Sequence, residues 1–293
     1  MEKRVVFRSS WLPWLLLLPQ MAVILVFFFW PAAQALLQSL QQQDPFGTSI
    51  EFVGLANFSQ LLDDPSYVES FKTTAFFSVM VAGIGISLSL VLAVFADRIV
   101  RGGMFYKTML VLPYAVAPAV AAVLWVFMFS PSLGVVAYAL GKIGINWNHL
   151  LDSGHAMTLI VMASVWKQIS YNFLFFLAGL QSIPKSLIEA AAIDGAKPWR
   201  RFWTIQFPLL SPTTFFLLVI NVVYAFFDTF AIVDAATQGG PGKDTAILVY
   251  KVYYDGFKAM DLGGSAAQSV VLMVIVVALT VIQFRYVEKK VQY

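Results

Sequence analysis

The stretch LPWLLLLPQMAVILVFFFWPAAQA, Leu12–Ala35, decides the fold class of this chain. It contains no charged residue, and about 20 apolar residues are enough for a helix to cross the hydrocarbon core of a bilayer. Lys3, Arg4 and Arg8 precede it, and Ala33-Gln34-Ala35 imitates a signal-peptide cleavage site. Because the apolar run of a signal peptide is only about 7–15 residues long, we expect an uncleaved membrane span.

The composition places the rest of the chain in a membrane as well. Hydrophobic residues make up 59%, charged residues 12%, and the mean hydropathy is +0.77. A soluble domain carries about 25% charged residues, so this chain lacks the polar surface that would face water. It has no cysteine and two histidines, which excludes disulfides and thiolate metal sites and argues against a zinc site.

Six apolar stretches are long enough to span a bilayer, and we expect helices because lipid offers the backbone no hydrogen-bond partners. The alternating segments of about ten residues that mark a transmembrane β-barrel are absent from the sequence. We therefore predict an all-α integral membrane protein with a single transmembrane domain over residues 1–293. The six predicted spans are Leu12–Ala35, Phe71–Ala96, Met104–Phe129, Ala156–Leu180, Phe207–Val233 and Ala266–Phe284.

The distribution of lysine and arginine predicts the orientation, because these residues are in excess on the cytoplasmic side. The first connection, Leu40–Ser70, contains neither of them, and the third contains only Lys142. We therefore expect both termini and the second and fourth connections to be cytoplasmic. These segments hold Lys3, Arg4, Arg8, Arg98, Arg101, Lys107, Lys185, Lys197, Arg200, Arg201, Arg285, Lys289 and Lys290.

The fourth connection, about residues 181–206, is polar and predicts a helix–turn–helix at the membrane surface. Ser182-Ile183-Pro184 is typical of a helix start, Leu187–Ile193 continues the helix, and Gly195 is placed to end it. Pro198 opens a second short helical piece. One interpretation is an amphipathic loop that rests on lipid headgroups; the other is a docking helix, because alanines let a partner approach closely.

The pattern of this connection resembles the EAA loop of ATP-binding-cassette (ABC) importer permeases. The family usually has leucine where Phe207 stands, and both residues are bulky and apolar. The resemblance implies that Glu189, Ala190, Ala191, Asp194 and Gly195 dock on a cytoplasmic ATPase subunit. It rests on Glu189-Ala190-Ala191, Asp194-Gly195-Ala196, Phe202, Ile205, Pro208-Leu209 and Pro212.

A second signature lies in the fifth connection and resembles the carbohydrate-uptake branch of these permeases. It consists of Thr237-Gln238-Gly239-Gly240-Pro241, Thr245, Tyr250, Tyr253, Phe257 and Ser265-Ala266-Ala267-Gln268-Ser269. Four further stretches are similar to permeases for sn-glycerol-3-phosphate, which implies that substrate: WLPWLLLLPQ (Trp11–Gln20), LPYAVAPAVAAVLWVFMF (Leu112–Phe129), SVWKQISYNFLFF (Ser164–Phe176) and NVVYAFFDTF (Asn221–Phe230).

The resemblance implies a type I ABC importer permease fold in the inner membrane of a bacterium. The implied partners are a second homologous permease, two copies of an ABC ATPase subunit and a periplasmic substrate-binding protein. ATP and Mg²⁺ would belong to the ATPase subunits, with no cofactor on this chain. The sequence agrees, because neither Gly141-Lys142 nor Gly242-Lys243 has the glycine spacing and following Ser/Thr of a phosphate-binding loop.

Polar side chains inside two consecutive spans predict a translocation pathway. Such residues normally face a bundle interior or a water-filled path. Asn221, Tyr224 and Asp228 share one helical face by their spacing of three and four residues, and Gln168, Tyr171 and Asn172 share another. Asn172 and Asn221 are alternatively interhelical hydrogen-bonding residues. Lys167 lies deep in its span, where it either pairs with Asp228 or attracts a substrate phosphate.

Three other functions are compatible with parts of the sequence. A permease for a neutral sugar or a glycerol phosphodiester would carry the same two signatures. A self-sufficient secondary transporter would show internal repeats with broken helices and would have no need for a docking loop. A membrane enzyme would require a cluster of catalytic or metal-ligating residues near one interface, and the sequence presents none.

Overall fold

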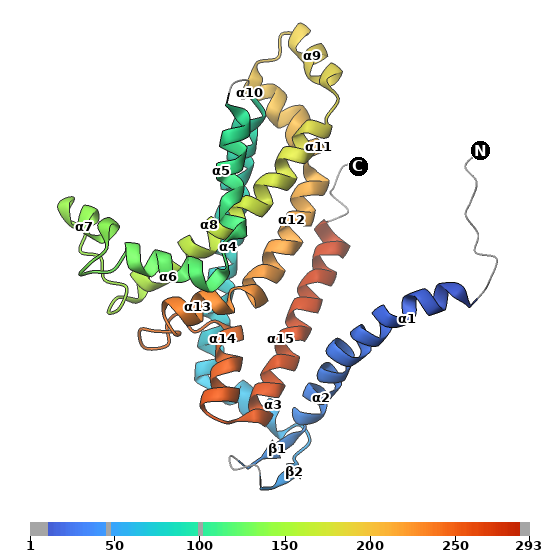
Figure 1. Cartoon of the computed structure of the whole chain (residues 1–293), viewed down its shortest axis with the longest axis vertical. Coiled ribbons are helices and arrows are strands. Elements are labelled where there is room, and N and C mark those ends of the chain that lie inside the picture. Colours follow the sequence, from blue (N-terminus) through green and yellow to red (C-terminus); the bar gives the residue numbers. More distant parts are fainter. Residues whose placement is uncertain (1–10, 45–47, 99–101, 288–293) are drawn as a thin grey trace. The chain divides into compact units, whose positions relative to one another are not determined.

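The structure is a computed structural model in which residues 11–44, 48–98 and 102–287 are described (Figure 1). The chain divides into two compact units, of which the first ends at Asp63 and also takes in Val252–Val271. The second runs from Asp64 to Lys251 and takes in the chain from Leu272 onward. Some charges that predict the orientation lie outside the described residues, namely Lys3, Arg4, Arg8, Arg101, Lys289 and Lys290.

The first unit consists of helices and one antiparallel two-stranded sheet, in which Gln41 pairs with Phe52 and Gln43 with Ile50. The Asn57 side-chain amide joins the sheet to the helices, donating at 2.9 Å to the carbonyls of both Ser39 and Gln41. The elements, with η for π-helical turns, are α1 (Leu12–Ile24), η1 (Leu25–Phe29), α2 (Trp30–Gln38), β1 (Gln41–Gln43), β2 (Ile50–Phe52), α3 (Ala56–Asp63), η4 (Tyr254–Lys258) and the start of α15 (Leu262–Ile282).

The second unit contains helices joined by loops, with no strand among its described residues, and holds the polar stripes of the predicted pathway. Its elements are α4 (Pro65–Arg98), α5 (Gly103–Ala115), α6 (Pro118–Met128), α7 (Val135–Lys142), α8 (Ser153–Ser182), α9 (Lys185–Ile193), α10 (Pro198–Arg201), η2 (Phe202–Gln206), α11 (Phe207–Leu209), α12 (Ser211–Val223), η3 (Tyr224–Asp228), α13 (Phe230–Ala236), most of α14 (Leu248–Tyr253), the rest of α15 and η5 (Gln283–Val287).

Five described helices are long and apolar enough to cross a bilayer, and they match five of the six predicted spans with shifted ends. A sixth is obtained if α5 and α6 count as one span, but the two are bent by 104°. The prediction of one continuous helix over Met104–Phe129 is therefore wrong. The five helices are Leu12–Gln38, Pro65–Arg98, Ser153–Ser182, Ser211–Asp228 and Leu262–Arg285.

Proline chemistry explains the break between α5 and α6. Pro118 has no N–H and its ring sterically excludes the residue before it from the helical conformation. Val116 and Ala117 are accordingly extended, with ψ of 131° and 142°. Pro118 then occupies the first turn of α6, where its missing N–H removes no hydrogen bond. Figure 1 shows α6 running across the direction of α5.

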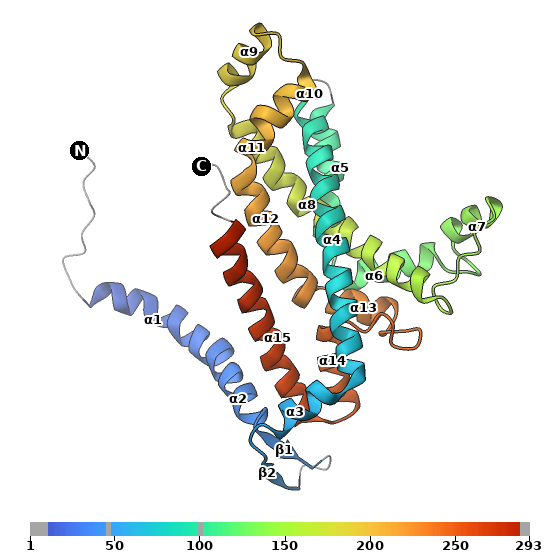
Figure 2. The same ribbon diagram turned by 180° about the vertical axis from the view of Figure 1, so that it is seen from behind.

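Helices α4, α8 and α12 pack side by side in the second unit, as Figures 1 and 2 both show. The Ser89 hydroxyl of α4 donates to the Ile169 carbonyl of α8 at 3.1 Å. Gly179 of α8 allows a close approach, because a Cβ there would lie 2.8 Å from Leu210 Cδ2. The apolar core of this bundle contains Ala93, Ala96, Phe173, Phe176, Leu177, Leu180, Ile183, Leu210 and Leu217.

The fourth connection forms the predicted helix–turn–helix. Pro184 is the N-cap of α9, and the helix ends at Ile193 with Asp194 as its C-cap. Gly195 follows, with a φ of +80° in the left-handed region. The Ala196 and Gly195 N–H groups donate to the Ala191 and Ala192 carbonyls at 2.9 and 3.1 Å. This is a Schellman motif, which satisfies the last carbonyls of the helix. Pro198 starts α10 as predicted.

The glycine-rich signature of the fifth connection forms a turn that folds back on its own helix. The Thr245 hydroxyl donates to the Gly240 carbonyl at 2.7 Å. Its oxygen also lies 2.8 Å from the Thr237 hydroxyl oxygen. Gly239 packs on the Tyr250 ring so closely that a Cβ would lie 2.7 Å from it. In this chain, therefore, the signature has a clear structural role.

Candidate functional site

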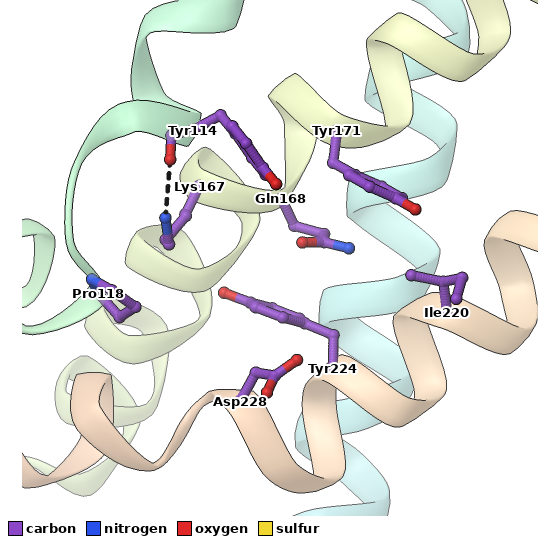
Figure 3. A pocket seen from close by; sticks show the side chains of 8 residues that line it. All are labelled: Tyr114, Pro118, Lys167, Gln168, Tyr171, Ile220, Tyr224 and Asp228. Atoms are coloured by element: carbon purple, nitrogen blue, oxygen red, sulfur yellow. Dashed lines mark hydrogen bonds between the residues drawn. The ribbon is translucent and has the colours of Figure 1, made fainter. Parts of the chain in front are cut away.

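A cavity of about 370 Å³ lies within the second unit, at the point where α5 breaks from α6 (Figure 3). Helices α8 and α12 and the turn η3 supply its other walls. Figure 3 shows Tyr114, Tyr171 and Gln168 facing Tyr224 across the cavity, with Asp228 beside Tyr224. The lining residues are Tyr114, Pro118, Lys167, Gln168, Tyr171, Ile220, Tyr224 and Asp228.

Five of the predicted pathway residues meet in this cavity. Lys167, Gln168 and Tyr171 come from successive turns of one face of α8, and Tyr224 and Asp228 come from η3. Tyr224 is buried, and its hydroxyl lies 3.4 Å from the Ser164 carbonyl, to which it donates a long hydrogen bond. Gln168 is also buried, whereas Asp228 is exposed.

Lys167 does not form the ion pair with Asp228 that the sequence left open. The two are absent from the ion pairs within 4.0 Å among the described residues. The Lys167 ammonium instead donates to the carbonyls of Val116 at 2.7 Å and Tyr114 at 3.2 Å. It also lies 5.7 Å from the centroid of the Tyr114 ring, within the range of a cation–π contact.

Asn172 and Asn221 lie outside this cavity, although they were predicted to line the pathway. Both side chains are fully buried, and each amide donates to the other, at 3.1 and 2.8 Å. Asn221 also donates to the Leu217 carbonyl at 2.7 Å. The arrangement matches the alternative role as hydrogen-bonding residues between helices.

Three lining residues were not selected from the sequence. Pro118 gave a partial signal, because a proline within an apolar run marks either a kink or a break, and breaks in spans line cavities. Tyr114 stands four residues before it and faces the cavity from the end of α5. Ile220 is apolar and cannot be distinguished by residue type from the lipid-facing residues around it.

The predicted docking residues form a second candidate site on α9 and the turn that follows it. Glu189, Ala190, Asp194 and Gly195 are exposed, and Ala191 is partly exposed. Ile193 is 87% exposed. Trp199 is also exposed and contacts Trp203 edge to face, with ring centroids 5.6 Å apart.

The chemistry of the cavity suits binding of a small polar solute. It offers tyrosine hydroxyls, an amide, one cation and one anion within an apolar surround. Among residues 11–44, 48–98 and 102–287, no group of three or more His, Cys, Asp or Glu side chains is placed to hold a metal ion.

Comparison with known families gives a match over most of the chain. The family model described as "Binding-protein-dependent transport system inner membrane component" matches residues 83–293. That region contains every residue of the cavity and of the α9–α10 turn.

Full-length relatives are similar as well. The chain is 63% identical to an sn-glycerol-3-phosphate transport system permease protein UgpA of Yersinia pseudotuberculosis, covering 98% of each chain. It is also 63% identical to the protein of that name from Agrobacterium fabrum, covering 99% of each.

Solved structures show the same fold at lower identity. The chain is 24% identical to a chain of a bacterial ABC transporter involved in the import of the acidic polysaccharide alginate, with a TM-score of 0.81 over 94% of this chain and 96% of that one. A chain of the MetNI methionine ABC transporter matches with a TM-score of 0.54 at 15% identity, over 81% of this chain and 99% of that one.

Proposed function

The chain belongs to the family of binding-protein-dependent transport system inner membrane components, and on that premise we propose that it is a permease subunit of an ATP-driven importer for sn-glycerol-3-phosphate. The proposed substrate rests on one observation, the 63% identity over nearly the whole of both chains to permeases named for that compound. The cavity is compatible with it, because tyrosine hydroxyls, an amide and an ammonium can bind a hydroxylated anion.

The proposed importer contains this chain, a second homologous permease, two copies of an ABC ATPase subunit and a periplasmic substrate-binding protein. This chain contributes passage across the membrane and no ATP chemistry; ATP and Mg²⁺ are held by the ATPase subunits. The binding protein delivers the substrate from outside, and the substrate crosses between the two permeases. Alternating access follows when closure of the ATPase subunits moves α9.

The docking role of α9 is supported by its exposure and its local order. Glu189, Ala190, Ala191, Asp194 and Gly195 lie together on a short helix that is closed by its own Schellman motif. A preformed helix loses little conformational entropy when it binds. Small alanine side chains let the ATPase backbone approach, and Glu189 offers a charge to a cationic partner.

The docking proposal is tested by Glu189→Lys in the co-expressed complex. We expect less ATPase subunit to co-purify and ATP-dependent uptake to fall by at least tenfold. Glu69→Lys is the matched control, since Glu69 is an exposed glutamate of α4 whose contact is a surface pair with Lys72, a type worth about 0–1 kcal/mol. Equal co-purification and equal uptake in the two variants would contradict the docking role.

The pathway proposal is tested by the accessibility of introduced cysteines to a thiol reagent. The chain has no cysteine of its own that would react as well. Tyr171→Cys and Asp228→Cys should react with a small hydrophilic thiol reagent in the intact complex, and substrate with its binding protein should slow the reaction. Ser164→Cys is the control, because Ser164 is fully buried on the same helix as Tyr171. If Tyr171→Cys reacts no faster than Ser164→Cys, or if substrate leaves its reaction rate unchanged during turnover, the cavity is not the pathway.

A neutral sugar or a glycerol phosphodiester is the alternative substrate within the same family. It predicts ATP hydrolysis that responds to a binding protein loaded with that compound and ignores sn-glycerol-3-phosphate. A secondary transporter would instead take up substrate without ATPase subunits. Both alternatives are decided by measuring uptake of labelled sn-glycerol-3-phosphate into proteoliposomes with and without the ATPase subunits.

A further inference from the structure

The break between α5 and α6 leaves a backbone carbonyl that the helix itself cannot satisfy. In a continuous α-helix the carbonyl of residue i accepts from the N–H of residue i+4. For Tyr114 that residue is Pro118, which has no N–H. The bond to the Tyr114 carbonyl is exposed in the isolated chain, but a carbonyl without a partner is unfavourable wherever lipid excludes water. Some other group must therefore supply the donor.

A second carbonyl at the break is in the same position. Helix α6 takes Ala117 as its first acceptor, because the Ala121 N–H donates to the Ala117 carbonyl at 2.9 Å. Val116 is extended and lies outside both helices, so its carbonyl points away from either ladder of hydrogen bonds. Tyr114 and Val116 are thus two of the acceptors that the break leaves without a donor from their own helix.

Lys167 supplies both missing donors from the neighbouring helix. Its ammonium donates to Val116 at 2.7 Å and to Tyr114 at 3.2 Å, and Figure 3 shows the side chain reaching from α8 to the end of α5. One turn further along α8, the Ser170 hydroxyl donates to the Leu110 carbonyl at 2.7 Å. Helix α8 is therefore attached to α5 at one point before the break and to the break itself through Lys167.

We propose that Lys167 is a positioning residue that tethers the α5–α6 break to α8 and so fixes the cavity wall formed by Tyr114 and Pro118. The Lys167 side chain is half-buried. The two carbonyl dipoles solvate its charge, so the charge does not require an ion pair with Asp228. The two lining residues that flank the tether, Tyr114 and Pro118, keep their places only while the bend is held. The effect of this tether on transport rests on the proposed function, whereas the bend itself does not.

The tether predicts that the bend depends on Lys167, which a distance measurement can detect. Spin labels at Met109→Cys on α5 and Phe127→Cys on α6 report the bend, and both positions are exposed. The measurement uses the assembled complex with its partner subunits. Loss of the bend would lengthen the label separation, by on the order of 10 Å if the two helices became one straight helix at 1.5 Å per residue.

We expect Lys167→Met to shift and broaden the distances toward longer values and to lower uptake at least tenfold. Lys167→Arg keeps a charged donor and should retain the wild-type distance with partial uptake. Lys107→Met is the matched control, because it removes a cation from α5 away from the break. If Lys167→Met does not assemble, Lys167→Gln, which retains a neutral donor, should show a partial shift.

The variant Pro118→Ala distinguishes a lysine that tethers the break from one that only stabilises the fold. This variant gives residue 118 an N–H that can donate to the Tyr114 carbonyl, so Lys167→Met should change the distance little in the Pro118→Ala background. An unchanged distance in Lys167→Met, or an equal shift in both backgrounds, would overturn the tether. If the distances respond but wild type shows no uptake of sn-glycerol-3-phosphate, the tether stands and the proposed substrate fails.

Discussion

Asn172 and Asn221 hold α8 and α12 together through two reciprocal amide hydrogen bonds, of 3.1 and 2.8 Å, with both side chains fully buried. Asn172→Leu should destabilise the complex, because it leaves the Asn221 amide without its partner. The expected loss is about 1–3 kcal/mol, measured as a lower unfolding midpoint of the purified complex in detergent.

The double variant Asn172→Leu/Asn221→Leu tests whether the pair is structural. Replacing both partners removes the unpaired amide, so we expect it to recover most of the stability that Asn172→Leu loses. Uptake should follow stability in both variants. If the double variant is as stable as wild type but transports nothing, the two amides act on substrate after all.

Gly179 sets the distance between α8 and the start of α12. Gly179→Ala would place a Cβ 2.8 Å from Leu210 Cδ2 and 3.0 Å from Thr213 Oγ1, so the helices must separate. Overpacking of this kind costs about 1–3 kcal/mol. The thermal midpoint of the complex should fall, while Gly83→Ala, where nothing lies within 4 Å, should leave it unchanged. Equal midpoints for both variants would show that this contact is not tight.

Gly195 closes the proposed docking helix in a conformation that other residues adopt with strain. Gly195→Ala introduces no clash, since nothing lies within 4 Å of the added Cβ, but a φ of +80° costs an alanine about 1–2 kcal/mol. We expect α9 to fray and the uptake per ATP hydrolysed to fall several-fold. Gly141→Ala, in α7 without a positive φ, is the control. The docking role of α9 would be weakened if both variants retained the wild-type ratio.

His149 makes the segment between α7 and α8 sensitive to acid. It is 3% exposed, and burial lowers the pKa of its imidazole below the ordinary value. The Phe129 carbonyl raises this pKa, but by less, and the charge of His155 lowers it further. The unfolded segment therefore binds a proton at a higher pH than the folded one does. The stability of the segment is complete above about pH 6.5 and declines as the pH falls through that value.

Hydrogen exchange measures this effect directly. Peptides covering residues 143–155 should lose protection between about pH 7.5 and pH 5, after correction for the intrinsic exchange rate, with a slope of up to about 1.4 kcal/mol per pH unit. His149→Gln should remove the pH dependence, and His155→Gln should leave most of it. If the pH dependence of protection survives in His149→Gln, a titratable group other than His149 causes it.

The fold class and the membrane location could be predicted from the sequence because hydrophobicity along the chain is a strong local signal. The all-α fold of a type I ABC importer permease and the multi-pass inner-membrane location are confirmed. The single domain over 1–293 and the cytoplasmic position of both termini stay predictions. The bend of 104° at Pro118 was missed, since a proline in an apolar run is compatible with either a kink or a break.

The candidate site was predictable only in part. Five polar residues predicted from the spans line the cavity, namely Lys167, Gln168, Tyr171, Tyr224 and Asp228. Their role in a translocation pathway stays a prediction. Residue spacing alone could not separate them from Asn172 and Asn221, because these two asparagines share the predicted helical faces of the residues that line the cavity. The contacts of Lys167 with two backbone carbonyls depend on where α5 ends, which no sequence pattern specified.

The central claim, an ATP-driven permease for sn-glycerol-3-phosphate, is tested most directly by uptake of the labelled compound into proteoliposomes that contain the co-expressed complex. The binding protein is supplied on the outward-facing side, ATP is enclosed, and each component is omitted in turn. We predict uptake that requires every component and is not reduced by excess neutral sugar. Uptake by this chain alone would contradict the account, as would an intact complex that hydrolyses ATP with a sugar-loaded binding protein and ignores sn-glycerol-3-phosphate.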